Sequence, residues 1–267
     1  MALKHSAAMD RDAFFRTSET FLVLTHSYGI GLLEQGFTKF SMNGRAVDVR
    51  YLTVPSATYE TFTGEVRYWQ EIKNHKPDYV LVLLGGNVVG SSRTREQMRS
   101  QATEFYRTLR FLLPRTTIIS AQVEMRWYKE DNFYGAPTEV QYRRDRNMLN
   151  NHIARQIPDK DYVLSIAGEG RLDNRDFYCK GDQGYIHMTP EGYELYTREI
   201  VKVINYIHMQ IKERYERIAQ EEEERENRRR EREMERENRR RAREMEALAR
   251  LDHKYRDMRR RDRHHPY

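Results

Sequence analysis

The sequence contains a single cysteine and no long hydrophobic run. Its 267 residues include only Cys179 as a thiol, so one chain can build neither a disulfide framework nor a thiolate metal site. No apolar stretch approaches the ~20 residues that a membrane-spanning helix needs, and the N-terminal segment lacks the continuous apolar stretch of a secretory signal. We therefore expect a protein without a membrane span in an intracellular compartment, either cytoplasmic or nuclear.

Neither sign of charge is in large excess, but charged residues are unevenly distributed. The chain has 47 Lys and Arg against 41 Asp and Glu, a formal net charge of +6. Residues 213–267 carry 35 charged side chains in 55 positions, whereas residues 1–212 carry 53 in 212, an ordinary fraction for a globular domain. Each part has a net charge of +3. The overall basicity therefore does not by itself indicate nucleic-acid binding.

Short apolar segments alternate with segments of helical spacing along the first 212 residues. Five segments have the pattern of strands: 21–24, 46–54, 79–84, 116–123 and 162–166. Apolar residues at helical spacing predict helices over 62–74, 95–113 and 141–157, and Thr189-Pro190 starts a last helix. This alternation predicts an α/β fold, a three-layer α/β/α flavodoxin-like sandwich with a five-stranded parallel sheet.

Proline and glycine are absent between Tyr193 and Met258, so the last helix is expected to continue as a long charged C-terminal helix. Glu and Arg recur there at i and i+4, as in Glu221–Arg225, and each such pair adds ~0.2–0.5 kcal/mol. Apolar residues near its end allow about two weak coiled-coil heptads. We expect a loose lead-in over residues 1–19, a folded domain over 20–207 and a Glu/Arg-rich helical tail over 208–267.

Polar residues with chemical potential follow the predicted strands, where functional groups of parallel sheets gather. Ser27 follows the first strand, Gly85-Gly86-Asn87 follows the third, and His187 precedes the last helix. Serine in such a position can act as a nucleophile, the asparagine amide can donate to a substrate oxygen, and histidine can act as a general base. Each residue also has an ordinary role as a helix cap, a turn or a packing residue, so none of them alone identifies a site.

In this order the three motifs resemble the SGNH, or GDSL-type, hydrolase superfamily. The resemblance covers roughly residues 20–207, and its best segments are 21–31, 77–87 and 187–193. Within the superfamily the sequence looks most like the divergent branch associated with animal mobile elements, because His26-Ser27 replaces Asp-Ser in the first block. Segments 122–126 and 146–151 add to this similarity. The resemblance implies the same α/β fold and acyl-ester hydrolysis.

The resemblance also implies roles for individual residues. Ser27 would attack the ester carbonyl, and His187 would take its proton and return one to the leaving alcohol. The oxyanion would be held by the backbone N–H of Ser27, by the Asn87 side chain and by a backbone N–H after the second strand, from Ser56 or Ala57. No cofactor is implied, and no metal-ligand motif stands out in the sequence.

The sequence departs from the family pattern at several positions. The glycine that the family carries after its second strand is not evident here, because that strand runs into Val54-Pro55-Ser56-Ala57 and Pro55 has no N–H to donate. Val88 replaces the aspartate that usually follows the asparagine corresponding to Asn87. Gly184 occupies the position three residues before His187, where the family carries its orienting acid. Asp182, five residues before His187, could take that role only if the loop bulges. These departures fit both a weakly active enzyme and one that has lost its catalytic activity.

Three functions remain open from the sequence. The first is a serine esterase that hydrolyses a short acyl or acetyl ester, with His26 as a packing residue beside Ser27. The second is a catalytically degenerate binding module whose tail contacts nucleic acid or a protein partner. The tail arginines that motivate this alternative are Arg256, Arg259, Arg260, Arg261 and Arg263. The third is a mainly structural protein in which the helix is a spacer.

Overall fold

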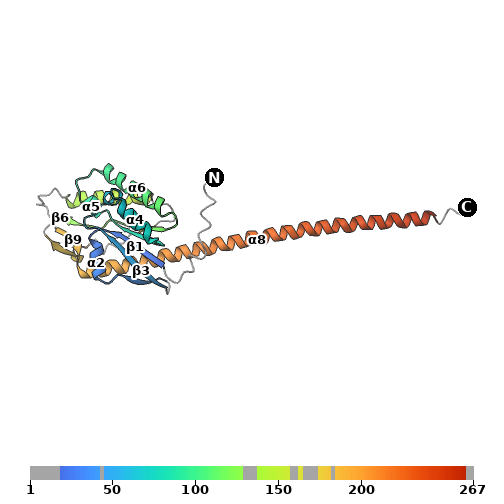
Figure 1. The fold of residues 1–267 in the computed structure, drawn as a ribbon, viewed down its shortest axis with the longest axis horizontal. Helices are drawn as coiled ribbons and strands as arrows, with labels where there is room; N and C mark the ends of the chain where they lie inside the picture. The colour runs from blue at the N-terminus through green and yellow to red at the C-terminus, as the bar shows by residue number, and fades with distance from the viewer. Residues whose placement is uncertain are drawn as a thin grey trace. The chain divides into compact units, whose positions relative to one another are not determined.

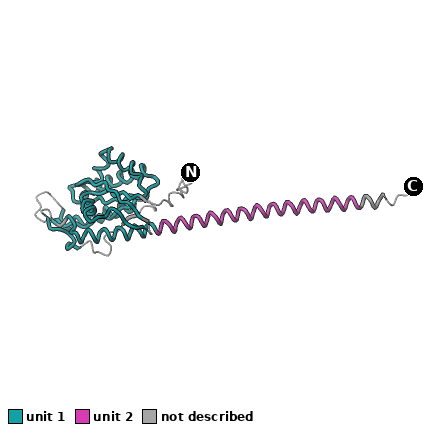
Figure 2. Tube along the Cα trace, turned by 60° about the horizontal axis from the view of Figure 1, so that its bottom comes forward, with its two compact units in different colours: residues 1–208 teal, residues 209–267 magenta. Residues whose placement is uncertain are grey.

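The computed structural model describes residues 19–42, 45–128, 137–156, 162–164, 174–181 and 184–262. The chain divides into two compact units, residues 1–208 and 209–267 (Figure 2). The first unit holds every strand and the site described below. In the described part of the chain, no helix is long and apolar enough to cross a membrane.

The main sheet has six strands in the order β2-β3-β1-β4-β5-β7. Their bounds are β1 (Glu19–Thr25), β2 (Lys39–Met42), β3 (Arg45–Thr53), β4 (Tyr79–Leu83), β5 (Thr117–Ala121) and β7 (Tyr162–Leu164). Strands β3, β1, β4, β5 and β7 are parallel, and β2 pairs antiparallel with β3 at one edge. The predicted five-stranded parallel sheet is confirmed, and the antiparallel edge strand β2 is an addition.

The central strand β4 explains why the apolar segments of the sequence form this sheet. Each of its five residues is buried, because helices cover both faces of a parallel sheet. A strand buried on both faces has no polar alternation, and a short continuous apolar run is its sequence pattern. In Figure 1, α4 and α6 lie on one side of the sheet, and α2 and the start of α8 lie on the other.

The described helices include those predicted over 95–113 and 141–157 and the last helix, but they differ from the prediction over 62–74. They are α2 (Tyr28–Glu34), α3 (Tyr59–Thr63), α4 (Val66–His75), α5 (Gly86–Val89), α6 (Arg95–Leu112), α7 (Glu139–Gln156) and α8 (Pro190–Asp262). The single helix expected over 62–74 is two helices, because Gly64 ends α3 and a new helix begins after Glu65. Phe105 of α6 contacts aromatic rings of α3 and α4, which joins these helices into one layer.

A second, three-stranded sheet was not predicted from the sequence. Its order is β6-β9-β8, formed by β6 (Trp127–Tyr128), β8 (Tyr178–Gly181) and β9 (Gly184–Met188), and a short 3₁₀ helix (Arg175–Phe177) precedes β8. All its pairs are antiparallel. Strands of two to five residues leave too few positions for an alternating pattern to be visible. This sheet carries His187.

Helix α8 begins as the sequence predicts and contributes to both units. Thr189 caps it, because its Oγ1 accepts a hydrogen bond from the N–H of Gly192 at 3.1 Å. Within the first unit, α8 buries Tyr196, Ile200 and Ile204. In the second unit, successive Glu–Arg pairs four residues apart line the helix, including Arg230–Glu226 at 2.8 Å.

Candidate active site

Three adjacent parallel strands bring separate sequence motifs to one edge of the main sheet. Thr25 at the end of β1 pairs with Thr53 of β3 on one side and with Leu83 of β4 on the other. Because parallel strands end at the same edge, the residues that follow them are neighbours. These residues are Ser56 after β3, Ser27 after β1 and Asn87 after β4.

Ser27 occupies the N-cap position of α2 but does not cap it with its side chain. Its backbone is helical, with φ −53° and ψ −22°, and its side chain makes no capping hydrogen bond. The residue is half-buried. The ordinary role of a serine at this position is therefore not used here, which leaves the hydroxyl available for another role.

Asn87 has its amide held at both ends. Its Nδ2 donates to the carbonyl oxygen of Ala57 at 3.0 Å, and its Oδ1 accepts from Nη1 of Arg126 at 2.8 Å. A guanidinium only donates, so these partners fix which end of the amide carries the oxygen. Nδ2 carries a second hydrogen, which has no partner among the described residues.

The turn after β3 leaves one backbone N–H for the site. Ala57 donates its N–H to the carbonyl oxygen of Val54 at 3.1 Å, so it closes the turn. Ser56 is exposed and has φ 59°, a left-handed conformation that favours glycine. The sequence suggested the N–H of Ser56 or of Ala57 as a donor to the oxyanion, and the geometry therefore favours Ser56.

His187 lies on β9, near Tyr28, the residue that follows Ser27. The hydroxyl of Tyr28 donates to the carbonyl oxygen of Ile186 at 2.6 Å, and the rings of Tyr28 and His187 are 6.1 Å apart between centroids. His187 is exposed. Partial burial and the nearby charge of Arg126 lower the pKa of His187, so its imidazole is neutral at pH 7.

The structure explains why the usual orienting acid is absent from position 184. Gly184 has φ +119°, and a Cβ placed there would lie 2.1 Å from the carbonyl oxygen of Trp127. Strand β6 pairs directly against this part of β9, with Tyr128 opposite Gly184. No side chain fits at this position without moving β6. Asp182, the alternative acid, lies outside the described residues.

A buried guanidinium connects these elements, and the sequence analysis assigned it no role. Arg126 is 2 % exposed. Besides Asn87, its Nη2 lies 3.4 Å from Nε2 of His26, and its Cζ lies 5.5 Å from the centre of the Tyr28 ring. His26 is fully buried, as expected for a packing residue, and its Nδ1 lies 3.4 Å from the N–H of Tyr28. A neutral imidazole accepts one of these contacts at a time.

His26 is kept uncharged by its surroundings. Burial first, and then the charges of Arg126 and His187, hold the pKa of His26 well below its ordinary value. Glu124, two residues before Arg126, is also buried. It accepts hydrogen bonds from the Tyr196 hydroxyl at its carboxylate and from the Tyr142 hydroxyl at its backbone oxygen. Burial raises the pKa of Glu124.

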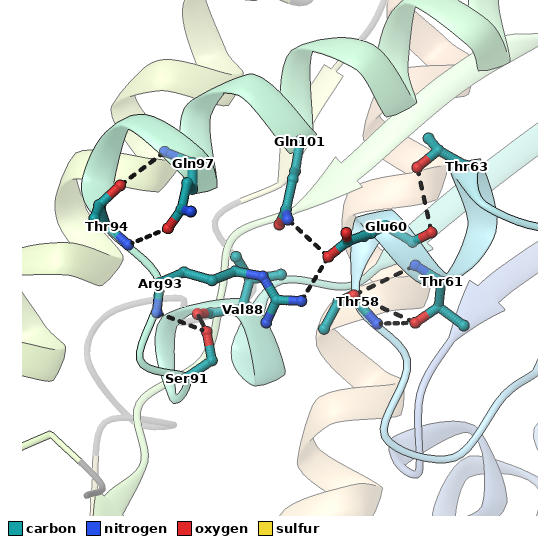
Figure 3. Close-up of polar contacts among 10 residues, drawn as sticks. All are labelled: Thr58, Glu60, Thr61, Thr63, Val88, Ser91, Arg93, Thr94, Gln97 and Gln101. Carbon is teal, nitrogen blue, oxygen red and sulfur yellow. Dashed lines mark hydrogen bonds and ion pairs between the residues drawn. The ribbon is translucent and has the colours of Figure 1, made fainter.

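A polar framework fixes the turn after β3 relative to α5 and α6. Thr58 caps α3 through Thr61, and Glu60 of α3 accepts from Arg93 at 2.7 Å and from Gln101 of α6 at 2.9 Å (Figure 3). Two further contacts in Figure 3 hold the ends of α5 and α6: Ser91 donates to the Val88 carbonyl, and Thr94 forms a capping box with Gln97. The Ser56 turn and the Asn87 helix are therefore braced from outside the site.

The tail arginines singled out in the sequence are only partly described. Arg256 forms an ion pair with Asp252 at 2.8 Å. The backbone at Arg259, Arg260 and Arg261 is helical, but their side chains are not described. Arg263 lies outside the described residues. The ion pair of Arg256 lies within the helix and does not indicate a partner molecule. Elsewhere in the described chain, no group of three or more His, Cys, Asp or Glu side chains could hold a metal ion.

Five parallel strands with helices on both faces define a flavodoxin-like α/β domain. The model of the GDSL-like lipase/acylhydrolase family matches residues 28–195, and the chain belongs to that family. The match begins one residue after Ser27 and includes both Asn87 and His187. A search of curated proteins found no match.

Solved structures give the same fold. A lipase/acylhydrolase from Enterococcus faecalis has a TM-score of 0.51 at 16% identity, covering 70% of this chain and 95% of its own. A Streptococcus pneumonia protein described as a platelet activating factor has a TM-score of 0.52 at 10% identity, covering 71% of this chain and 84% of its own. Identities this low establish the fold and leave the chemistry to the residues of this chain.

Proposed function

We propose that the protein is a serine esterase that cleaves a short acyl ester, such as an acetyl ester, at the edge of its main sheet. Membership of the GDSL-like family supports hydrolase chemistry. The observation that carries the proposal is the fixed Asn87 amide, whose second Nδ2 hydrogen has no partner in the described part of the chain and which follows β4, the strand that pairs with β1 before Ser27. A donor held in place before the reaction is what stabilisation of an oxyanion needs.

The reaction would proceed in two steps. Ser27 Oγ forms a bond to the ester carbonyl carbon while its proton moves to the neutral imidazole of His187. The alkoxide leaves with that proton as an alcohol. Water then attacks the acyl-Ser27, again giving a proton to His187, and Ser27 recovers its proton as the carboxylic acid is released. The N–H groups of Ser27 and Ser56 and the Asn87 amide hold the oxyanion in both steps.

Because position 184 carries no acid, we propose a Ser-His pair in which Asp182 is not required. Loss of the orienting acid from a triad costs about 10⁴-fold in kcat elsewhere. A slow enzyme is therefore expected. The animal mobile-element branch, suggested by His26-Ser27, and an intracellular location stay predictions.

Release of p-nitrophenol from p-nitrophenyl acetate by the full chain tests the proposal. Wild type should turn over, while Ser27→Ala and His187→Ala should fall to the uncatalysed rate. Cys179→Ala is the matched control, because it removes another nucleophilic side chain, exposed on the neighbouring strand β8. Equal rates for folded wild type and Ser27→Ala would favour the degenerate binding module.

A second function, binding of nucleic acid by the tail, is favoured by one observation on α8. At ~100° per residue, eight arginines fall within a sector of about 120° that contains no acidic residue between positions 225 and 243. They are Arg225, Arg228, Arg229, Arg232, Arg236, Arg239, Arg240 and Arg243. Among the described ion pairs of the tail, none involves Arg232, Arg236 or Arg243, which run along the middle of this arginine face.

The arginine face suits a polyanion better than a folded protein. Met234 and Met245 lie on the opposite side of the helix, so the face offers no apolar anchor of the kind that protein interfaces use. Every cation on the face is arginine, whose planar fork matches phosphate oxygens. We therefore propose sequence-independent contact with a phosphate backbone.

Fluorescence anisotropy with a labelled 20-base-pair DNA duplex tests this second function. Arg232→Gln/Arg236→Gln should weaken binding. The slope of log K against log salt concentration should become less negative by nearly two, because each lost phosphate contact contributes about −0.9. The matched control is Arg230→Gln/Arg241→Gln, which removes two arginines that lie opposite the face and pair with Glu226 and Glu237. Equal losses in the two variants, or no binding at low salt, would remove the proposal.

A further inference from the structure

We propose that Arg126 is a positioning residue that holds the Asn87 amide with its N–H toward the reacting oxygen. This inference rests on the proposed esterase function and adds a residue to it. Arg126 lies between β5 and β6, and its Nη1 donates to Oδ1 of Asn87 in α5, the helix that follows β4.

Holding a guanidinium in this place is costly, which argues for a specific role. Arg126 is 2 % exposed, and its Nε is buried without a hydrogen-bond partner in the described part of the chain. No ion pair joins Arg126 directly to a carboxylate among the described residues. A buried, incompletely satisfied cation destabilises the folded state. Its presence here therefore favours a role that offsets this cost.

The contacts show what the guanidinium does to the amide. An asparagine side chain can turn over and exchange its oxygen with its nitrogen, because the two ends have the same shape. Here the oxygen faces Nη1 of Arg126 at 2.8 Å, and a turned amide would place an N–H against a guanidinium that can only donate. Donation from Nδ2 to Ala57 at 3.0 Å adds a second constraint. Arg126 therefore selects the orientation in which Asn87 is a donor to the site.

The neighbouring sequence makes room for this contact. A Cβ on Gly86 would lie 2.4 Å from Nη2 of Arg126. The residue before Asn87 must therefore be glycine for the guanidinium to remain in place. Gly86 has no positive φ, so an alanine there is acceptable to the backbone itself. Gly86→Ala consequently displaces the guanidinium without removing its charge.

Kinetics of the full chain on p-nitrophenyl acetate test the inference. Asn87→Ala should lower kcat by ~10²–10³-fold. Arg126→Met and Gly86→Ala should each lower kcat with little change in KM, and neither should slow the Asn87→Ala enzyme further. Arg110→Met is the matched control, because Arg110 donates to Thr116 at the start of β5, away from the site. Its kcat should stay within about twofold of wild type. If Arg126→Met lowered kcat by the same factor in the wild-type and Asn87→Ala backgrounds, the inference would be overturned.

A spectroscopic measurement separates this inference from the proposed function. In ¹⁵N-labelled wild type, the two Nδ2 hydrogens of Asn87 should give separate, sharp signals. In folded Gly86→Ala or Arg126→Met both signals should move toward the chemical shifts of a solvated asparagine, because the amide is then free to turn about its Cβ–Cγ bond and to leave its hydrogen-bond partners. This outcome requires no turnover. Absence of esterase activity would defeat the proposed function alone, whereas unchanged Asn87 signals in a folded variant would defeat the positioning role.

Discussion

At the scale of single residues, His26 and Arg126 show how the site is kept in one charge state. The two side chains are buried and lie 3.4 Å apart between Nε2 and Nη2. A cation so close to an imidazole excludes a second positive charge, so the ring is neutral. His26 therefore contributes shape and a lone pair beside Ser27, and our proposal assigns the proton transfer to the more exposed His187.

This arrangement predicts a pH dependence of stability. The folded pKa of His26 lies well below its ordinary value, whereas the unfolded chain protonates it near about 6.5. Below pH 6.5 the unfolded state thus binds the additional proton, and the free energy of unfolding falls by up to about 1.4 kcal/mol per pH unit. Urea titrations at pH 7.5 and 5.5 should show a smaller fall for His26→Gln than for wild type. Equal falls would show that His26 is not the responsible group.

At the scale of elements, the short sheet β6-β9-β8 determines what the site lacks. The pairing of β9 with β6 places Gly184 against the backbone of Trp127 and excludes a side chain where an orienting acid usually lies. In the proposed mechanism, the main sheet would supply the nucleophile and the oxyanion donors, and this smaller sheet would supply the base.

Restoring the acid by substitution should fail for this reason. Gly184→Asp places a Cβ 2.1 Å from the Trp127 carbonyl oxygen in a positive-φ conformation. The conformation alone costs about 1–3 kcal/mol, and the close contact adds to it. We therefore expect a loss of stability above this range and no gain in kcat. Urea unfolding and ester hydrolysis of the variant measure the two effects. Gly181→Asp, opposite in the β8–β9 pair and without a close contact in that space, is the control. Higher kcat in Gly184→Asp would contradict the structural account.

The main sheet was predictable from the sequence because its strands are continuous apolar runs, such as Phe21–Leu24, buried on both faces. Ser27, Asn87 and His187 could be found because they follow or precede such elements. Arg126 could not be assigned, since its role depends on a contact with Asn87 that spans 39 positions. The one available signal was Gly86, whose small size is explained only once the guanidinium is seen. Strand β6 has two residues, which are too few to show the alternating pattern of a strand in the sequence.

At the scale of the whole chain, the second unit is a helix with almost no apolar surface to bury. Its stability is expected to come from pairs such as Arg241–Glu237 at 2.7 Å and Arg250–Glu246 at 2.6 Å, each adding ~0.2–0.5 kcal/mol. Far-ultraviolet ellipticity of the full chain should therefore be independent of protein concentration and should decrease in 1 M NaCl. An increase with concentration would instead indicate self-association through the exposed apolar residues near the end, such as Leu248 and Tyr255.

The central claim is that Ser27 is an activated nucleophile, and covalent labelling tests it most directly. Diethyl p-nitrophenyl phosphate phosphorylates a serine that a neighbouring base activates, and intact-protein mass spectrometry counts the adducts. We predict one diethylphosphoryl group per wild-type chain, mapped to Ser27, none on Ser27→Ala, and slower labelling of His187→Ala and Arg126→Met. A folded wild-type chain that gains no adduct, or one that is labelled equally after Ser27→Ala, would contradict the account.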